Sequence, residues 1–149
     1  MIRCETPRSL PETIQEMERR AANYADKVLA GKIPANRWLI AAVKRDQRDR
    51  KRQRPNGARG AIRFNAKAAF KVISFFGLLR HTKGRDFAGK VFDLSNWELW
   101  ATYVLFGWER RNDDGNWVRR FNTAYIEVAR KNGKSTWASA IGLYLLVMD

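Results

Sequence analysis

Residues 124–135 read AYIEVARKNGKS, and the fold of this chain is decided by how this stretch is interpreted. Residues 124–128 are short and rich in β-forming side chains, which predicts a strand. From Lys134 to Leu146 the chain is apolar on nearly every side, which predicts a buried helix. A strand, a basic loop that ends in Gly-Lys-Ser and a helix follow one another in the order that a phosphate-binding loop requires.

The residue types of this loop suit a phosphate group. Gly133 lets the backbone approach a phosphate closely, and the start of the following helix adds partial positive charge. Lys134 supplies a cation for the β- and γ-phosphates, and the hydroxyl of Ser135 suits a Mg²⁺ ion. The candidate residues for nucleotide binding are Val128, Ala129, Arg130, Lys131, Asn132, Gly133, Lys134, Ser135 and Thr136.

The match to the pattern G-x-x-x-x-G-K-[ST] is incomplete, because Val128 occupies the position of the first glycine. A bare Gly-Lys-Ser triplet is weak evidence in a chain this basic, so the prediction depends on the strand before it and the helix after it. The alternative interpretation is an ordinary surface loop between a strand and a helix.

The chain has 149 residues and a formal net charge of +14, which favours polyanionic partners. Nucleic acid is the first partner to consider, although an acidic membrane or a ribosome would also attract this charge. We expect no membrane span, because no apolar run approaches about 18 residues. Cys4 is the single cysteine, so no internal disulfide is possible and a reducing cytosol fits.

Helical spacing of apolar residues predicts a mostly helical N-terminal part. We expect one helix over 11–30, a second from about Asn36, a third capped by Asn65 and a fourth capped by Ser95 or Asn96 and ended by Gly107. Residues 112–117 predict a turn. His81 follows the third helix without other metal-ligand side chains at suitable spacing, so we interpret it as a helix-end residue.

The second half of the second helix, residues 44–54, is strongly basic and contains two acidic residues. A solvated helix end and a contact to a phosphate backbone are both consistent with this composition. The candidate DNA-binding residues are Lys44, Arg45, Arg48, Arg50, Lys51, Arg52 and Arg54.

The motifs of this chain resemble those of the large subunit of tailed-phage terminase, the DNA-packaging ATPase. Residues 129–135, ARKNGKS, are similar to the deviant phosphate loop of that family. Residues 92–98, FDLSNWE, followed by LFGW at 105–108, resemble the segment that precedes the loop there. Three further segments resemble this family: residues 24–33, HTKG at 81–84 and GK at 89–90. The resemblance therefore covers roughly residues 20–149.

The resemblance implies an ATP- and Mg²⁺-binding role, with Ser135 holding the metal and Arg130 contacting the γ-phosphate or coupling it to DNA movement. Trp97 and Glu98 would lie beside the adenine. The family usually has Gln where this chain has Glu98, and an ionised carboxylate only accepts hydrogen bonds whereas an amide also donates. The preference for adenine is therefore open.

The resemblance also implies partners and a location. These are double-stranded DNA, the terminase small subunit, the portal protein and further copies in a ring homo-oligomer, in the bacterial host cytoplasm. No acidic Mg²⁺-binding strand and no nuclease domain follow residue 149, so we expect a truncated or split gene or a fragment. The parent family is an ATPase with an endonuclease domain, but from this chain alone we expect weak nucleotide binding and no appreciable hydrolysis.

The fold class expected from these observations is α/β, an incomplete P-loop NTPase whose helical N-terminal part precedes a strand–P-loop–helix unit. We expect a basic helical region over residues 1–60 and the first part of an ATPase domain over residues 61–149. The function expected is that of the motor that packages double-stranded DNA into procapsids. The alternatives are a basic nucleic-acid-binding module without enzymatic activity and an inactive prophage remnant.

Overall fold

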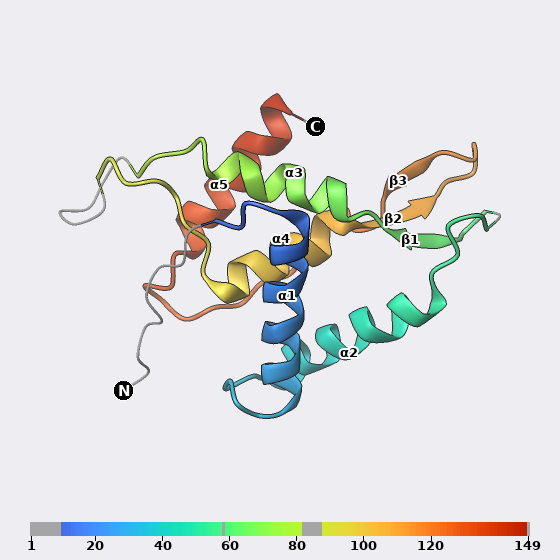
Figure 1. Ribbon diagram of the computed structural model, residues 1–149, viewed down its shortest axis with the longest axis horizontal. Coiled ribbons are helices and arrows are strands. Elements are labelled where there is room, and N and C mark those ends of the chain that lie inside the picture. The colour runs from blue at the N-terminus through green and yellow to red at the C-terminus, as the bar shows by residue number, and fades with distance from the viewer. Residues whose placement is uncertain (1–9, 58, 82–87, 149) are drawn as a thin grey trace.

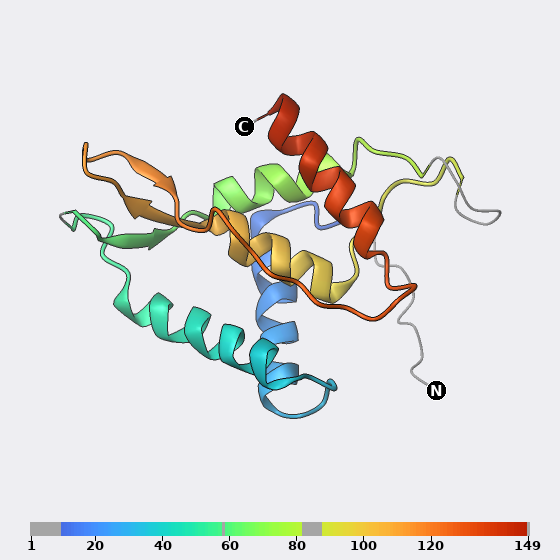
Figure 2. The same cartoon turned by 180° about the vertical axis from the view of Figure 1, so that it is seen from behind.

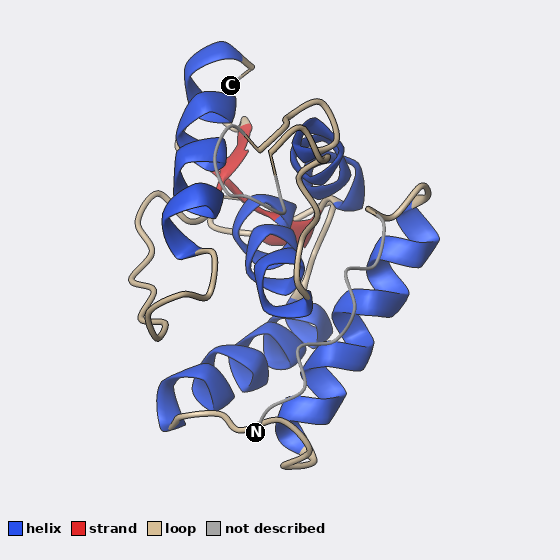
Figure 3. Cartoon of the chain, turned by 90° about the vertical axis from the view of Figure 1, so that its left-hand side faces the viewer, coloured by secondary structure: helices blue, strands red, loops and turns tan. Residues whose placement is uncertain are grey.

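The computed structural model describes residues 10–57, 59–81 and 88–148 (Figure 1). Helices make up most of it, and the strands form one small patch (Figure 3). The elements in chain order are α1 (Ile14–Leu29), α2 (Arg37–Arg52), β1 (Ile62–Phe64), α3 (Ala66–Phe76), α4 (Asn96–Gly107), β2 (Trp108–Arg111), β3 (Trp117–Arg119) and α5 (Lys134–Val147).

Side-chain caps fix the starts of the first three helices. The side chains of Thr13, Asn36 and Asn65 each accept a hydrogen bond from the backbone N–H three residues later. Ser95 precedes α4 as a capping residue, and its backbone N–H donates to the carboxylate of Glu98. The four helices predicted in the N-terminal two-thirds of the chain are therefore confirmed, including the caps at Asn65 and Ser95.

The hydrophobic core surrounds α4, which packs against both α1 and α3. Met17 of α1, Ile73 and Phe76 of α3 and Leu99 of α4 are fully buried. Because α1 contributes to the same core as α3 and α4, the N-terminal helices position the elements that follow. The domain boundary at residue 60 stays a prediction.

The three strands form an antiparallel sheet in the order β1-β2-β3. Phe64 pairs with Trp108 in the first ladder, and Arg111 pairs with Trp117 in the second. The turn predicted at residues 112–117 is confirmed as the connection of the β2–β3 hairpin. The structure is thus a mixture of helices and a small antiparallel sheet, which is compatible with the expected α/β class.

The predicted strand at residues 124–128 is wrong, because the structure has no strand there. A strand is stabilised by hydrogen bonds to a neighbouring strand, and the three described strands lie elsewhere. Tyr125 is 89% exposed. The segment 120–133 runs from the hairpin back along α4, so α5 starts beside the N-terminal end of α4 (Figure 2).

The helix predicted from Lys134 forms as α5, but it is buried along one side rather than throughout. In α5 only Trp137, Ala140 and Tyr144 are buried, and these lie on one side at helical spacing. Leu143, Leu146 and Val147 are exposed. An apolar composition favours burial of a helix, but the helix is covered only where other elements of the chain lie against it.

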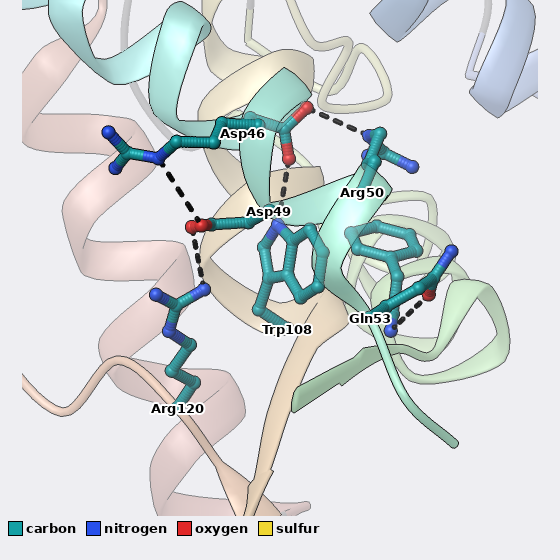
Figure 4. A network of polar contacts seen from close by, with 8 residues as sticks. Asp46, Asp49, Arg50, Gln53, Trp108 and Arg120 are labelled. Carbon is teal, nitrogen blue, oxygen red and sulfur yellow. Dashed lines mark hydrogen bonds and ion pairs between the residues drawn. The ribbon is translucent and has the colours of Figure 1, made fainter. Parts of the chain in front are cut away.

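A buried polar network connects α2 to the sheet (Figure 4). Asp46 Oδ1 accepts a hydrogen bond of 2.7 Å from the indole N–H of Trp108, and Asp46 Oδ2 accepts one of 2.9 Å from Arg50. Asp49 accepts a hydrogen bond of 2.8 Å from Arg120, the residue after β3. The two carboxylates of the basic helix therefore face inward and hold α2 against the sheet.

Candidate nucleotide-binding site

The loop at residues 128–135 curls back on itself and is open to solvent. Lys131 and Gly133 adopt positive φ angles of 67° and 75°, which turn the chain before α5 begins. Within the curl, Asn132 Nδ2 donates to the carbonyl of Ala129 and Lys134 Nζ donates to the carbonyl of Val128, both over 3.4 Å. The backbone therefore has a compact turn at the N-terminus of a helix, as the loop prediction requires.

The candidate side chains of the loop are accessible to a ligand. Arg130, Lys131, Ser135 and Thr136 are all exposed, as is Lys134 at the first position of α5. In the described part of the chain no three or more His, Cys, Asp or Glu side chains gather as metal ligands. A Mg²⁺ ion bound here would therefore need the phosphate oxygens and water in addition to the hydroxyl of Ser135.

Two cavities among the described residues lie away from the loop. One cavity of about 220 Å³ lies between α3, α5 and the sheet, where Lys71, Phe106 and Tyr144 contribute to its lining. A second, of about 400 Å³, lies beside Arg63 and Lys67. The residues of the loop at 128–135 line neither of them.

The start of α4 lies directly against the loop. Glu98 is only 5% exposed, and its Oε1 atom lies 2.8 Å from the position that a Cβ on Gly133 would take. Its Oε2 atom accepts hydrogen bonds from the backbone N–H and the hydroxyl of Ser95, at 2.9 and 2.7 Å. The structure thus brings Glu98 and the loop together, although they are far apart in the sequence.

Two further contacts join α4 to α5. The indole N–H of Trp137 donates a hydrogen bond of 3.0 Å to the hydroxyl of Thr102, which itself donates to the carbonyl of Glu98 over 2.7 Å. The rings of Trp97 and Trp137 are in contact, with centroids 5.5 Å apart. The resemblance places Trp97 and Glu98 beside adenine. In the structure they belong to the contact between α4 and α5 that orients α5.

Sequence reasoning did not identify Thr102 and Trp137 as partners, since a contact between two helices leaves no local pattern. The capping role of Glu98 could have been predicted from the sequence, because Ser95 and Glu98 have the S-x-x-E spacing of a capping box. That spacing predicts a carboxylate that is held by the helix start.

The basic helix α2 presents its cations outward, with one exception. At 100° per residue, Lys44, Arg45, Arg48, Lys51 and Arg52 share one side of the helix with Arg37, and all are exposed. Arg54 lies just after the helix and is also exposed. Arg50 instead turns inward, where its guanidinium pairs with Asp46 and lies over the ring of Phe64 at 4.2 Å.

The interpretation of His81 as a helix-end residue is wrong, because α3 ends at Phe76 and the backbone of His81 pairs with that of Lys90 and Gly89. The ring of His81 stacks on Phe92 with centroids 4.7 Å apart. Residues 82–84, the rest of the HTKG motif that resembles the terminase family, lie outside the described residues, as does Cys4. The described helices include none with the length and apolarity of a membrane span.

Replacing Gly133 with alanine is expected to destabilise the fold by about 1–2 kcal/mol. A residue with a Cβ is disfavoured at the φ of 75°, and the new Cβ would lie 2.8 Å from Glu98. Chemical denaturation measures the change. Gly142→Ala is the matched control, since its Cβ would meet nothing within 4 Å inside α5, and alanine there should stabilise by about 0.5–1 kcal/mol. Equal effects of the two substitutions would contradict the expectation.

The ionisation of Glu98 is expected to make stability depend on pH. Burial raises the pKa of Glu98 above its ordinary value, and the charge of Asp93 adds to this, while the hydrogen bonds from Ser95 oppose it. A raised folded pKa means that stability is fully present below the ordinary pKa of about 4.3 and falls as pH rises through the folded pKa. Glu98→Gln should therefore gain stability relative to the original chain between pH 4 and pH 8. Thermal melts of both proteins test this, and a difference independent of pH would disprove it.

The comparisons with known proteins bear on this same region. Residues 96–149 match the family model of the terminase large subunit, ATPase domain. No curated protein and no solved structure matches the chain. The matched segment contains α4, the hairpin, the loop at residues 128–135 and α5. The contacts between α4 and α5 and the curled loop thus all lie within the segment that matches this ATPase-domain model.

Proposed function

We propose that the loop at residues 128–135 binds the phosphates of Mg-ATP, as the nucleotide site of a terminase motor that drives double-stranded DNA into procapsids. The observation that carries the proposal is the curl of residues 128–134 at the start of α5, within the segment that matches the terminase ATPase domain. Lys134 and Ser135 would contact phosphate and Mg²⁺, and Arg130 the γ-phosphate.

The geometry supports binding more strongly than hydrolysis. No described strand lies beside the loop to supply the carboxylates that hold Mg²⁺ and activate water in such motors. We therefore propose that the described residues bind a nucleotide weakly and hydrolyse it slowly by themselves. The proposal includes what the resemblance implies for the whole motor. These implications are a P-loop NTPase fold, a ring of copies, the small subunit and the portal protein as partners, and a location in the host cytoplasm.

The test is thermal protection by nucleotide. A ligand that binds the folded chain raises its melting temperature in proportion to the logarithm of ligand concentration over Kd. Addition of 5 mM Mg-ATP should raise the melting temperature measurably, and 5 mM Mg-AMP should raise it less because it lacks the β- and γ-phosphates. Equal melting temperatures with and without Mg-ATP at every concentration would disprove nucleotide binding.

A second candidate function is sequence-independent binding of double-stranded DNA by the outer side of α2. The observation that favours it is the burial of both carboxylates of this basic helix, which leaves cations as the only charged groups on its outward surface. From Arg37 to Arg52 this surface is about 22 Å long, at 1.5 Å per residue. Six cations over this length suit contacts to several successive phosphates.

Neutralising two of these cations should lower the salt dependence of DNA binding. In Arg48→Gln with Lys51→Gln, we expect the slope of log K against log salt to fall by about 2, because each lost phosphate contact removes about 0.9. Fluorescence anisotropy with a short duplex of mixed sequence measures the slope. The pair Lys32→Gln with Lys67→Gln removes the same charge outside α2. An identical slope for both pairs would show that α2 makes no phosphate contacts.

A further inference from the structure

The carboxyl group of Glu98 lies between the first turns of α4 and α5. One oxygen, Oε2, is held by the backbone N–H and hydroxyl of Ser95 at 2.9 and 2.7 Å. The other, Oε1, lies 2.8 Å from the position that a Cβ on Gly133 would take. Since Gly133 is the residue that caps α5, a carboxylate is fixed beside the helix start that the loop would offer to a phosphate.

The charge of this carboxylate opposes the binding of a phosphate. The start of a helix attracts one anion through its free N–H groups, and Glu98 already places an anion there. Glu98 is 5% exposed, so water screens its charge poorly. Lys134, Arg130 and Lys131 attract phosphate to the same loop, but their side chains are exposed and more strongly screened.

We infer that Glu98 weakens the binding of polyphosphates to the loop at residues 128–135 through its charge, while its side chain packs beside Gly133. This inference rests on the proposed nucleotide site. The two effects of Glu98 are separable, because Glu98→Gln has nearly the same shape, keeps an oxygen that accepts from Ser95 and lacks the charge. Removing the charge should therefore improve phosphate binding without disturbing the contact between α4 and α5.

The nature of the ligand distinguishes a charge effect from recognition of the base. A negative charge beside the loop repels phosphates whatever base they carry, and it leaves an uncharged nucleoside unaffected. A side chain that reads the base would instead change the preference between adenine and guanine. Inorganic tripolyphosphate, ATP, GTP and adenosine are therefore the four probes needed.

The experiment is isothermal titration of the full chain and of Glu98→Gln at pH 8 in the presence of Mg²⁺. We expect Glu98→Gln to bind tripolyphosphate, ATP and GTP about tenfold more tightly, and adenosine with unchanged affinity. Asp113→Asn is the matched control, since it makes the same charge change at the exposed tip of the hairpin. Its affinities should stay within about twofold of those of the original chain.

Each other outcome has a defined meaning. Equal or weaker polyphosphate binding by Glu98→Gln overturns the inference, and so does a gain confined to ATP. If the original chain and Glu98→Gln both fail to bind tripolyphosphate and ATP, the proposed nucleotide site fails with it. A thermal melt checks that Glu98→Gln is folded. Should it be unfolded, Glu98→Met, which also lacks the charge and has similar volume, is titrated in its place.

Discussion

Lys134→Ala is expected to abolish most of the thermal protection that Mg-ATP gives to this chain. Lys134 is exposed at the first position of α5, beside the curl formed by residues 128–133. A hydrogen bond between a cation and a phosphate contributes about 1.5–3 kcal/mol, so its loss should weaken binding by roughly tenfold to a hundredfold. The measurement is the shift of melting temperature over a series of Mg-ATP concentrations.

The substitution of Lys134 should leave the unliganded fold almost unchanged. Its side chain is exposed, and exposed substitutions usually change stability by less than about 0.5 kcal/mol. A cation at a helix N-terminus is also unfavourable, so alanine avoids that cost. Lys67→Ala is the matched control, because Lys67 is an exposed lysine in the first turn of α3. Nucleotide protection that is equal in the two variants would exclude Lys134 from phosphate binding.

Asp46→Ala is expected to have the largest effect on stability among single substitutions of polar residues, about 3 kcal/mol. Asp46 is 6% exposed and accepts from both Trp108 and Arg50. Burial alone would lower the pKa of Arg50, but the hydrogen bond and charge of Asp46 outweigh it and raise the pKa above its ordinary value. Alanine would leave a buried indole N–H and a partly buried guanidinium without this acceptor, which is costly.

The loss of stability should appear as a melting temperature lower by roughly 6–12 °C, at about 2–4 °C per kcal/mol for a chain of this size. Gln47→Ala, at the neighbouring exposed position of α2, should change the melting temperature by less than about 2 °C. A small effect of Asp46→Ala would mean that the network between α2 and the sheet contributes little to stability.

Local patterns were sufficient for the helices. The caps at Asn65 and Ser95 and the apolar stripes of α1 and α3 depend on residues within one or two turns, so the sequence contains them. The turn at residues 112–117 follows from its own Asp, Gly and Asn residues. By contrast, β1, β2 and β3 were missed, because each has only three or four residues and is stabilised by its neighbours in space.

The error at residues 124–128 has the same cause. A β-rich composition shows which backbone conformation is favourable, but only a neighbouring strand turns an extended segment into part of a sheet. For α5, the composition predicted a buried helix, and the structure covers only the side of Trp137, Ala140 and Tyr144. The basic run of α2 was identified from sequence, whereas the inward direction of Arg50 followed from its pairing with Asp46.

The sequence by itself determined which groups the loop carries, since Gly133, Lys134 and Ser135 are adjacent along the chain and their proposed roles depend on residue type and spacing. Only the tertiary structure decided what surrounds it. Glu98 comes to lie against Gly133 because the segment after β3 returns along α4 and starts α5 beside its N-terminus. The charge next to the loop is therefore a property of the packing between two helices, which no local pattern encodes.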